Sequence, residues 1–168
     1  MMRGVGAADM VLTPKGLRFF GTTYPCTIGR GAVTTTKREG DGATPRGCHH
    51  IVGMLYRPDR ILPPNNWGVP IGPGDLWSDD SAEVDYNTQV RAPYTASHEA
   101  LRRADPLYDL VLLTDWNWPN AIPGHGSAIF IHQWRRPGYP TEGCVALSRK
   151  NLHKIASMAK PGTRLIIP

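Results

Sequence analysis

A cysteine and a histidine in residues 127–147 (SAIFIHQWRRPGYPTEGCVAL) are spaced like a nucleophile and its base. The apolar run 127–131 predicts a short strand that delivers His132 at its end, and Cys144 closes the loop that follows. Thiolate is the nucleophilic form of cysteine, and a nearby imidazole can lower the thiol pKa or take its proton. Gly143 lets the backbone approach a substrate and frees N–H groups for an oxyanion pocket. The pattern predicts nucleophilic catalysis by cysteine.

Several residues around this pair are candidates to contact a substrate. Trp134 and Tyr139 flank the loop, where they either form apolar pocket walls or hold the loop down. Thr141 is placed to hydrogen-bond the turn or the substrate. His125 lies seven residues before His132 and either lines the pocket or is an exposed loop residue.

The order of the motifs is typical of one enzyme family. Ile131-His132 ends a strand, and Thr141-Glu142-Gly143-Cys144 follows it. Earlier in the chain, residues 37–47 (KREGDGATPRG) contain a Thr-Pro-x-Gly loop. Residues 108–111 and 126–130 fit the sequence pattern of the same family. Together these motifs, spread over most of residues 10–168, resemble the catalytic domain of L,D-transpeptidases, the YkuD-like fold.

The resemblance implies a chemistry and a substrate. Cys144 would attack the L,D bond of peptidoglycan stem tetrapeptides, between the diamino acid at position three and D-alanine, and form a thioacyl-enzyme with no metal or other cofactor. If water accepts the acyl group, the protein is an L,D-carboxypeptidase of cell-wall recycling. If the amine of a second stem accepts it, the protein is an L,D-transpeptidase that forms cross-links. We favour water, because no export signal is visible in the sequence.

One position departs from the family pattern. Many members carry an arginine two residues after the cysteine to bind a substrate carboxylate, and this chain has Ala146 there. The candidates to replace that arginine are Arg46, Arg135 and Arg136, because a guanidinium binds carboxylate in a bidentate way.

Two other classes of function remain open. A non-catalytic cell-wall binding module would keep the fold and bind muropeptides with an unreactive Cys144. A zinc amidase would use His125, His132 and Cys144, although the chain has no His-Glu-x-x-His motif. Cys48, His49 and His50 are adjacent, and adjacent strand residues point to opposite faces, so a shared metal ion there is disfavoured.

Composition favours a mainly β fold. The 168 residues include 18 glycines and 16 prolines, which suits a β-sandwich-like mixed sheet with two short helices in a single domain, 1–168. Residues 9–14 and 16–20 predict a hairpin, 107–114 a central strand, and 95–104 and 149–159 the helices. The Pro/Gly-rich excursion at about 58–87 predicts an irregular insertion near the site, held to the body by Trp67 and Trp77.

The net charge, the hydropathy and the N-terminal segment indicate which partners and which compartment to expect. The net charge is +5, but no basic-aromatic array or recognition-helix pattern indicates nucleic-acid binding. No run is long enough for a membrane span, and residues 1–9 lack the apolar core of a signal peptide, so we expect a cytoplasmic protein, or a periplasmic one if a leader was removed. The chain has three cysteines, and the sequence leaves open whether Cys26 and Cys48 form a disulfide. It also leaves the oligomeric state open.

Overall fold

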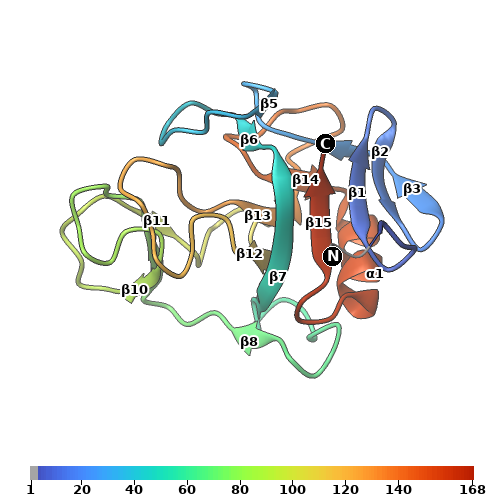
Figure 1. Cartoon of the computed structure of the whole chain (residues 1–168). Helices are drawn as coiled ribbons and strands as arrows, with labels where there is room; N and C mark the ends of the chain where they lie inside the picture. The colour runs from blue at the N-terminus through green and yellow to red at the C-terminus, as the bar shows by residue number, and fades with distance from the viewer. Residues whose placement is uncertain (1–3) are drawn as a thin grey trace.

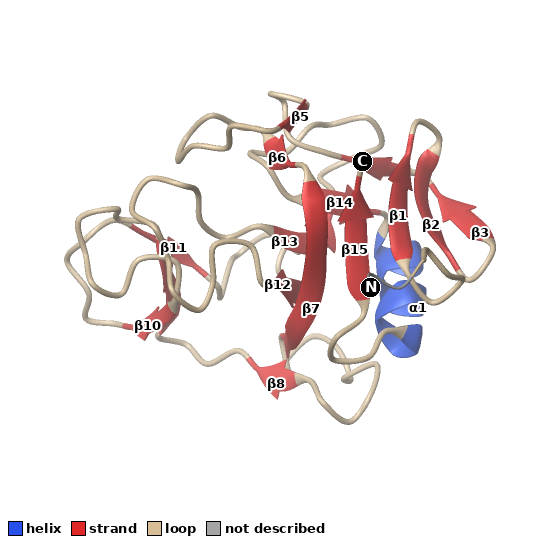
Figure 2. Cartoon of the chain, viewed as in Figure 1, coloured by secondary structure: helices blue, strands red, loops and turns tan. Residues whose placement is uncertain are grey.

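One long mixed sheet dominates the computed structural model, which describes residues 4–168 (Figures 1 and 2). Its strands, in spatial order, are β3 (Thr22–Tyr24), β2 (Gly16–Phe19), β1 (Met10–Thr13), β15 (Arg164–Ile167), β7 (Gly47–Tyr56), β12 (Leu110–Thr114), β13 (Phe130–Gln133), β14 (Val145–Leu147) and β4 (Cys26–Thr27), and β8 (Val69–Pro70) pairs with β7. The pairs β1–β15, β13–β14 and β7–β8 are parallel. Because β3 and β4 are consecutive in the chain but end the order, the sheet is nearly closed. The predicted hairpin and the predicted mainly β class are confirmed.

Alternating residues on the central strands supply a separate core on each face of this sheet. On β12, Leu110 belongs to the first core and Val111 to the second. On β13, Ile131 belongs to the first core and Phe130 to the second. Since side chains alternate along a strand, His132 faces the same side as Phe130. The period-2 pattern therefore directs the histidine toward the second core.

The helix α1 (Arg149–Met158) covers the first core. Its start follows from Ser148, whose hydroxyl oxygen accepts a hydrogen bond from the Asn151 N–H at 3.3 Å. Leu152, Ile155 and Ala156 recur at helical spacing and are buried in the first core. The predicted C-terminal helix is confirmed. α1 leaves the opposite face of the sheet to the loops that build the site.

A small lobe stands beside the main sheet, at the left of Figure 1. Its three-stranded sheet has the order β10 (Gln89–Arg91), β9 (Asp75–Ser78), β11 (His98–Ala100). Trp77 joins it to the body: its ring packs edge-on against Phe130, with the ring centroids 4.9 Å apart. Trp67 also packs against the first core, as predicted. The Pro/Gly-rich excursion thus contains β8 and β9, and the longest of these has only four residues.

The predicted helix over 95–104 is wrong. The segment contains β11, which pairs antiparallel with β9 and places Glu99 opposite Trp77. Its residues favour a helix locally, but the open edge of β9 offers hydrogen bonds and Leu101 is fully buried in the second core. Local propensity is a weak preference that such tertiary contacts override. The described residues therefore form a single helix, α1.

Two predictions about the termini and cysteines meet the structure only partly. The prediction that residues 1–9 lack a signal peptide includes residues 1–3, which lie outside the described residues. Over residues 4–168, no helix is long and apolar enough to cross a membrane. Cys26, Cys48 and Cys144 are all free, so the pairing that the sequence left open is not formed.

Candidate active site

A cavity of about 430 Å³ opens on the face of the sheet that carries the second core. His132 and Cys144 both line it. The parallel pairing of β13 with β14 explains this, because Ile131 lies opposite Val145 and both are fully buried in the first core. His132 follows Ile131 on β13 and Cys144 immediately precedes Val145 of β14, so both consequently face the other side. The two predicted catalytic side chains thus share one cavity.

His132 is held in one tautomer. Its Nδ1 lies 2.7 Å from the carbonyl oxygen of Gln133, which can only accept, so Nδ1 carries the proton and Nε2 keeps a lone pair. The ring of Tyr108 packs edge-on against the imidazole, with centroids 5.3 Å apart. The orienting partner, which the sequence did not reveal, is a backbone carbonyl. This arrangement suits a general base that accepts a proton at Nε2.

Cys144 is buried, with 8% of its surface exposed. The thiol donates to the carbonyl oxygen of Ala128 at 3.1 Å, and its sulfur accepts the N–H of Phe130 at 3.4 Å. Phe130 begins β13 and Ala128 lies just before it, so the strand that presents the histidine also orients the sulfur.

Burial keeps both groups neutral at rest. It raises the pKa of the Cys144 thiol to about 12 and lowers the pKa of His132 to about 4. The N–H of Phe130 and the charge of Lys37 lower the thiol pKa less, and Glu99 raises it further. The resting pair is therefore a thiol and a neutral imidazole.

The turn before the cysteine is closed by Thr141. Its hydroxyl donates to the carbonyl oxygen of Cys144 at 2.6 Å and accepts the N–H of Gly143 at 3.1 Å. Gly143 has a φ of +141°, and a Cβ there would lie 2.8 Å from the carbonyl oxygen of Ala43. Only glycine fits this close backbone contact without displacing a neighbour.

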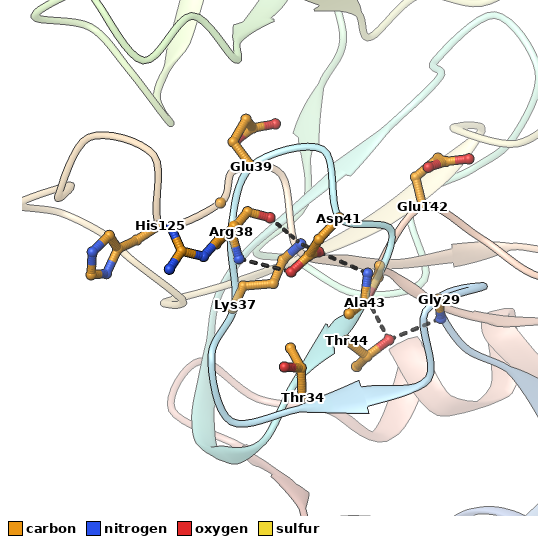
Figure 3. Close-up of polar contacts among 12 residues, drawn as sticks. Gly29, Thr34, Lys37, Arg38, Glu39, Asp41, Ala43, Thr44, His125 and Glu142 are labelled. Carbon is orange, nitrogen blue, oxygen red and sulfur yellow. Dashed lines mark hydrogen bonds and ion pairs between the residues drawn. The ribbon is translucent and has the colours of Figure 1, made fainter.

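Thr44, in the Thr-Pro loop, clamps this turn from a distant part of the chain. The strand β6 (Thr44–Pro45) pairs with β5 (Val33–Thr34). The fully buried hydroxyl of Thr44 donates to the carbonyl oxygen of Gly143 at 2.8 Å and accepts the N–H of Gly29 at 2.9 Å. Figure 3 shows Thr44 pointing toward Gly29 at the base of the loop. The early loop of the family pattern thus positions the cysteine turn.

Asn87 supports the sulfur from the lobe side. Its Oδ1 accepts the N–H of Ala128 at 3.0 Å and the indole N–H of Trp77 at 3.0 Å. Its Nδ2 donates to the carbonyl oxygens of Trp116 and Asn117. The carbonyl oxygen of Ala128 in turn accepts a hydrogen bond from the thiol, so one buried amide connects the lobe to the Cys144 side chain.

The structure brings some of the predicted contact residues to the cavity and not others. Trp134, Arg135, Tyr139 and Thr141 line it. Arg46 is exposed and does not line it. His125 lies in a separate pocket with Pro123 and Lys37, and Figure 3 shows it pointing away from Lys37. Arg136 lies over the ring of Tyr139, 4.9 Å from its centroid.

Seven charged or aromatic lining residues escaped the sequence reasoning. They are Lys37, Glu39, Asp79, Glu99, Arg103, Tyr108 and Glu142. Four of them lie on the lobe or just after it, in segments assigned to an irregular excursion, a helix and a strand. Their position depends on how the lobe pairs, which no local pattern signals. Lys37 and Glu39 lie in the Thr-Pro loop, where the family motif was a usable signal.

The zinc alternative does not match the arrangement of the predicted ligands. His132 and Cys144 share the cavity, but His125 lines the other pocket. Among residues 4–168, no group of three or more His, Cys, Asp or Glu side chains is arranged to hold a metal ion. On β7, Cys48 and His50 are exposed while His49 is buried, as expected of adjacent strand residues.

Comparison with protein-family models now gives the class. The model for the L,D-transpeptidase catalytic domain, YkuD, matches residues 13–167, nearly the whole chain. The chain belongs to this family, whose members are cysteine-type L,D-transpeptidase domains acting on peptidoglycan stem peptides. Searches of curated proteins and of solved structures returned no match.

Proposed function

We propose that the protein transfers the acyl group of peptidoglycan tetrapeptide stems through a thioester on Cys144. The observation that carries this proposal is that the imidazole on β13 and the thiol immediately before the paired strand β14 line one cavity. The bond attacked is the L,D bond between the diamino acid at stem position three and D-alanine. Residues 13–167 would act as one catalytic unit.

The neutral resting pair defines the first step. As the Cys144 sulfur attacks the carbonyl carbon, Nε2 of His132 takes the thiol proton. The tetrahedral oxyanion lies against the amides of Gly143 and Cys144, where it replaces the Thr141 hydroxyl as the acceptor of the Gly143 N–H. One such donor is worth about 3–4 kcal/mol in known cases. Collapse expels D-alanine, which takes the proton from His132, and leaves the thioacyl-enzyme.

We propose water as the acceptor, which makes the protein an L,D-carboxypeptidase. After D-alanine leaves, His132 is neutral again and takes a proton from water as the water attacks the thioester. The tetrahedral intermediate then expels the Cys144 sulfur, which takes that proton from His132, and the tripeptide stem is released as a carboxylic acid. An amine acceptor must be unprotonated to attack, whereas the carboxylates of Glu39, Asp79 and Glu99 line the cavity and favour the protonated ammonium. Cell-wall recycling in the cytoplasm would supply free muropeptides for this reaction.

Arg135 is the best replacement for the arginine that Ala146 lacks. Lys37 and Arg103 also line the cavity, but Lys37 pairs with Asp41 and Arg103 with Asp105. Within the described chain, Arg135 forms no ion pair. It is therefore the cavity cation left to bind a substrate carboxylate. Arg135→Gln should raise KM about tenfold or more, because a charge-assisted hydrogen bond is lost; Arg136→Gln is the matched control.

The acceptor is tested by product mass. Incubation with a disaccharide tetrapeptide should yield the tripeptide and free D-alanine. Joined stems instead would make the protein an L,D-transpeptidase. Binding without any product would favour the cell-wall binding module, which the buried, neutral thiol leaves as the second candidate. Fast thiol labelling at neutral pH, expected of an activated cysteine, is not a suitable discriminator, because burial slows it in either case.

A further inference from the structure

The charges that line the active cavity are not balanced. Of its four carboxylates, Glu142 pairs with Arg30, with atoms 2.9 Å apart. The other three, Glu39, Asp79 and Glu99, form no ion pair with any residue from 4 to 168. These three carboxylates thus lack a direct ion pair within the described chain, although the charge of Arg103 acts on Glu99 from a distance and lowers its pKa.

Each of these three carboxylates is held by a neutral hydroxyl group. Tyr86 donates to Glu39 at 2.5 Å, Ser97 to Asp79 at 2.6 Å, and Tyr108 to Glu99 at 3.0 Å. These bonds fix the carboxylates without neutralising them. A fixed carboxylate without a direct ion pair in a partly enclosed cavity attracts a cation more strongly than one in open water.

Glu99 is the member nearest the chemistry. It is half-buried, and its partner Tyr108 packs edge-on against His132. Its negative charge is close enough to raise the pKa of the Cys144 thiol. Burial is the main cause that raises the pKa of Glu99, and the charges of Asp79 and Glu39 add to it. A cation bound at Glu99 would relieve both effects.

We propose that Glu99 is a specificity-determining residue that binds a primary ammonium group of the stem peptide, with Glu39 and Asp79 reinforcing it. This inference rests on the proposed function, because the stem is the substrate. The diamino acid carries such an ammonium on its side chain, one residue from the bond that Cys144 attacks. Arg135 would bind a carboxylate of the same substrate, so the cavity reads one charge of each sign. An acceptor amine is the other source of an ammonium, but a carboxylate would hold it in its protonated, unreactive form.

The test compares two tetrapeptides, one with the side-chain amine of the diamino acid free and one with that amine acetylated. For the wild-type protein, kcat/KM for D-alanine release should be about 10–100-fold higher with the free amine, the value of one charge-assisted hydrogen bond. Glu99→Gln keeps an acceptor for the Tyr108 hydroxyl and should lose most of this preference by slowing only the free-amine substrate. Glu83→Gln, which changes an exposed carboxylate of the same lobe, should keep the preference.

Three other results would contradict the role of Glu99, its assignment to the donor stem or the proposed function, and they can be told apart. Equal turnover of the two substrates by the wild type, or an unchanged preference in Glu99→Gln, would overturn the role of Glu99. If Glu99→Gln altered only the use of added amine acceptors, the assignment to the donor stem would be wrong. If neither substrate were cleaved by any of the proteins, the proposed function itself would fail. Glu39→Gln repeats the comparison should Glu99→Gln not fold, and it should reduce the preference.

Discussion

The residue that decides the chemistry of the resting site is His132. Its Nδ1 proton is fixed by the carbonyl oxygen of Gln133, and its burial removes the positive charge that a free histidine would carry in mild acid. Cys144 is equally buried, so neither member of the pair is ionised before substrate arrives. In the mechanism that we propose, a neutral pair makes catalysis depend on proton transfer during attack rather than on a standing thiolate.

The acid limb of the pH–rate profile tests this at the residue scale. His132 must be neutral to accept the thiol proton, and its pKa is lowered to about 4. We expect kcat/KM to hold as the pH falls through the ordinary histidine range of about 6.5 and to decline only near pH 4. The measurement is D-alanine release against pH from the tetrapeptide whose side-chain amine is acetylated, so that protonation of Glu99, whose pKa is raised, does not contribute to the profile. Circular dichroism at each pH confirms folding. A decline centred near the ordinary histidine pKa would contradict the account.

At the scale of elements, the cysteine turn is held from outside. Thr44 reaches it from β6, and Asn87 reaches the preceding segment from the lobe. Neither residue touches the cavity, since neither lines it. The catalytic geometry therefore depends on contacts between parts of the chain that are about 40–100 residues apart.

Thr44→Val tests the clamp. Valine keeps the shape of the side chain but leaves the N–H of Gly29 and the carbonyl oxygen of Gly143 without their buried partner. We expect about 2–3 kcal/mol less free energy of unfolding in urea, because unsatisfied buried groups cost about 1–3 kcal/mol each. The rate constant kcat should also fall about tenfold or more as the turn shifts. Thr34→Val, on the paired strand β5, removes a partly exposed hydroxyl and should change both quantities little. Equal effects of the two variants would refute the clamp.

Sequence patterns predicted the elements whose signals are local. The apolar run that became β12, the Ser148 cap of α1 and the hairpin of β1 and β2 all carry such signals. They also predicted the pair His132 and Cys144. The lobe could not be predicted, because β11 forms only by pairing with β9, and its own residues favour a helix. The cavity residues Asp79, Glu99 and Arg103 were missed for the same reason.

At the scale of the whole molecule, two faces of one sheet have separate tasks. The face covered by α1 holds the larger core, which includes Leu110, Ile131 and Ile155. The other face packs the lobe through Trp77 and Phe130 and leaves the cavity beside them. The larger core and the candidate active site thus lie on opposite sides of the same strands, because side chains alternate along β13.

Acid should destabilise the whole fold through its buried histidines. Burial lowers the pKa of both His49 and His132 in the folded protein, so protons bind more tightly to the unfolded chain. Their contribution to stability is complete above the unfolded pKa of about 6.5 and is lost as pH falls below it, by up to about 1.4 kcal/mol per pH unit for each histidine. Urea midpoints between about pH 7 and pH 5 measure this.

A matched pair of variants assigns that acid effect. His49→Gln should weaken the pH dependence, whereas His98→Gln, which replaces an exposed histidine, should not. Identical pH dependence in the wild type and His49→Gln would mean that His49 takes no part in it.

The most direct measurement is D-alanine release from a disaccharide tetrapeptide by three variants, in each of which one cysteine is replaced by alanine. Cys144→Ala should lose on the order of a thousandfold or more in rate, as expected when a nucleophile is removed. Cys26→Ala and Cys48→Ala should retain wild-type rates, because neither residue lines the cavity. Release that persists in a folded Cys144→Ala protein would contradict the assignment of Cys144 as the nucleophile.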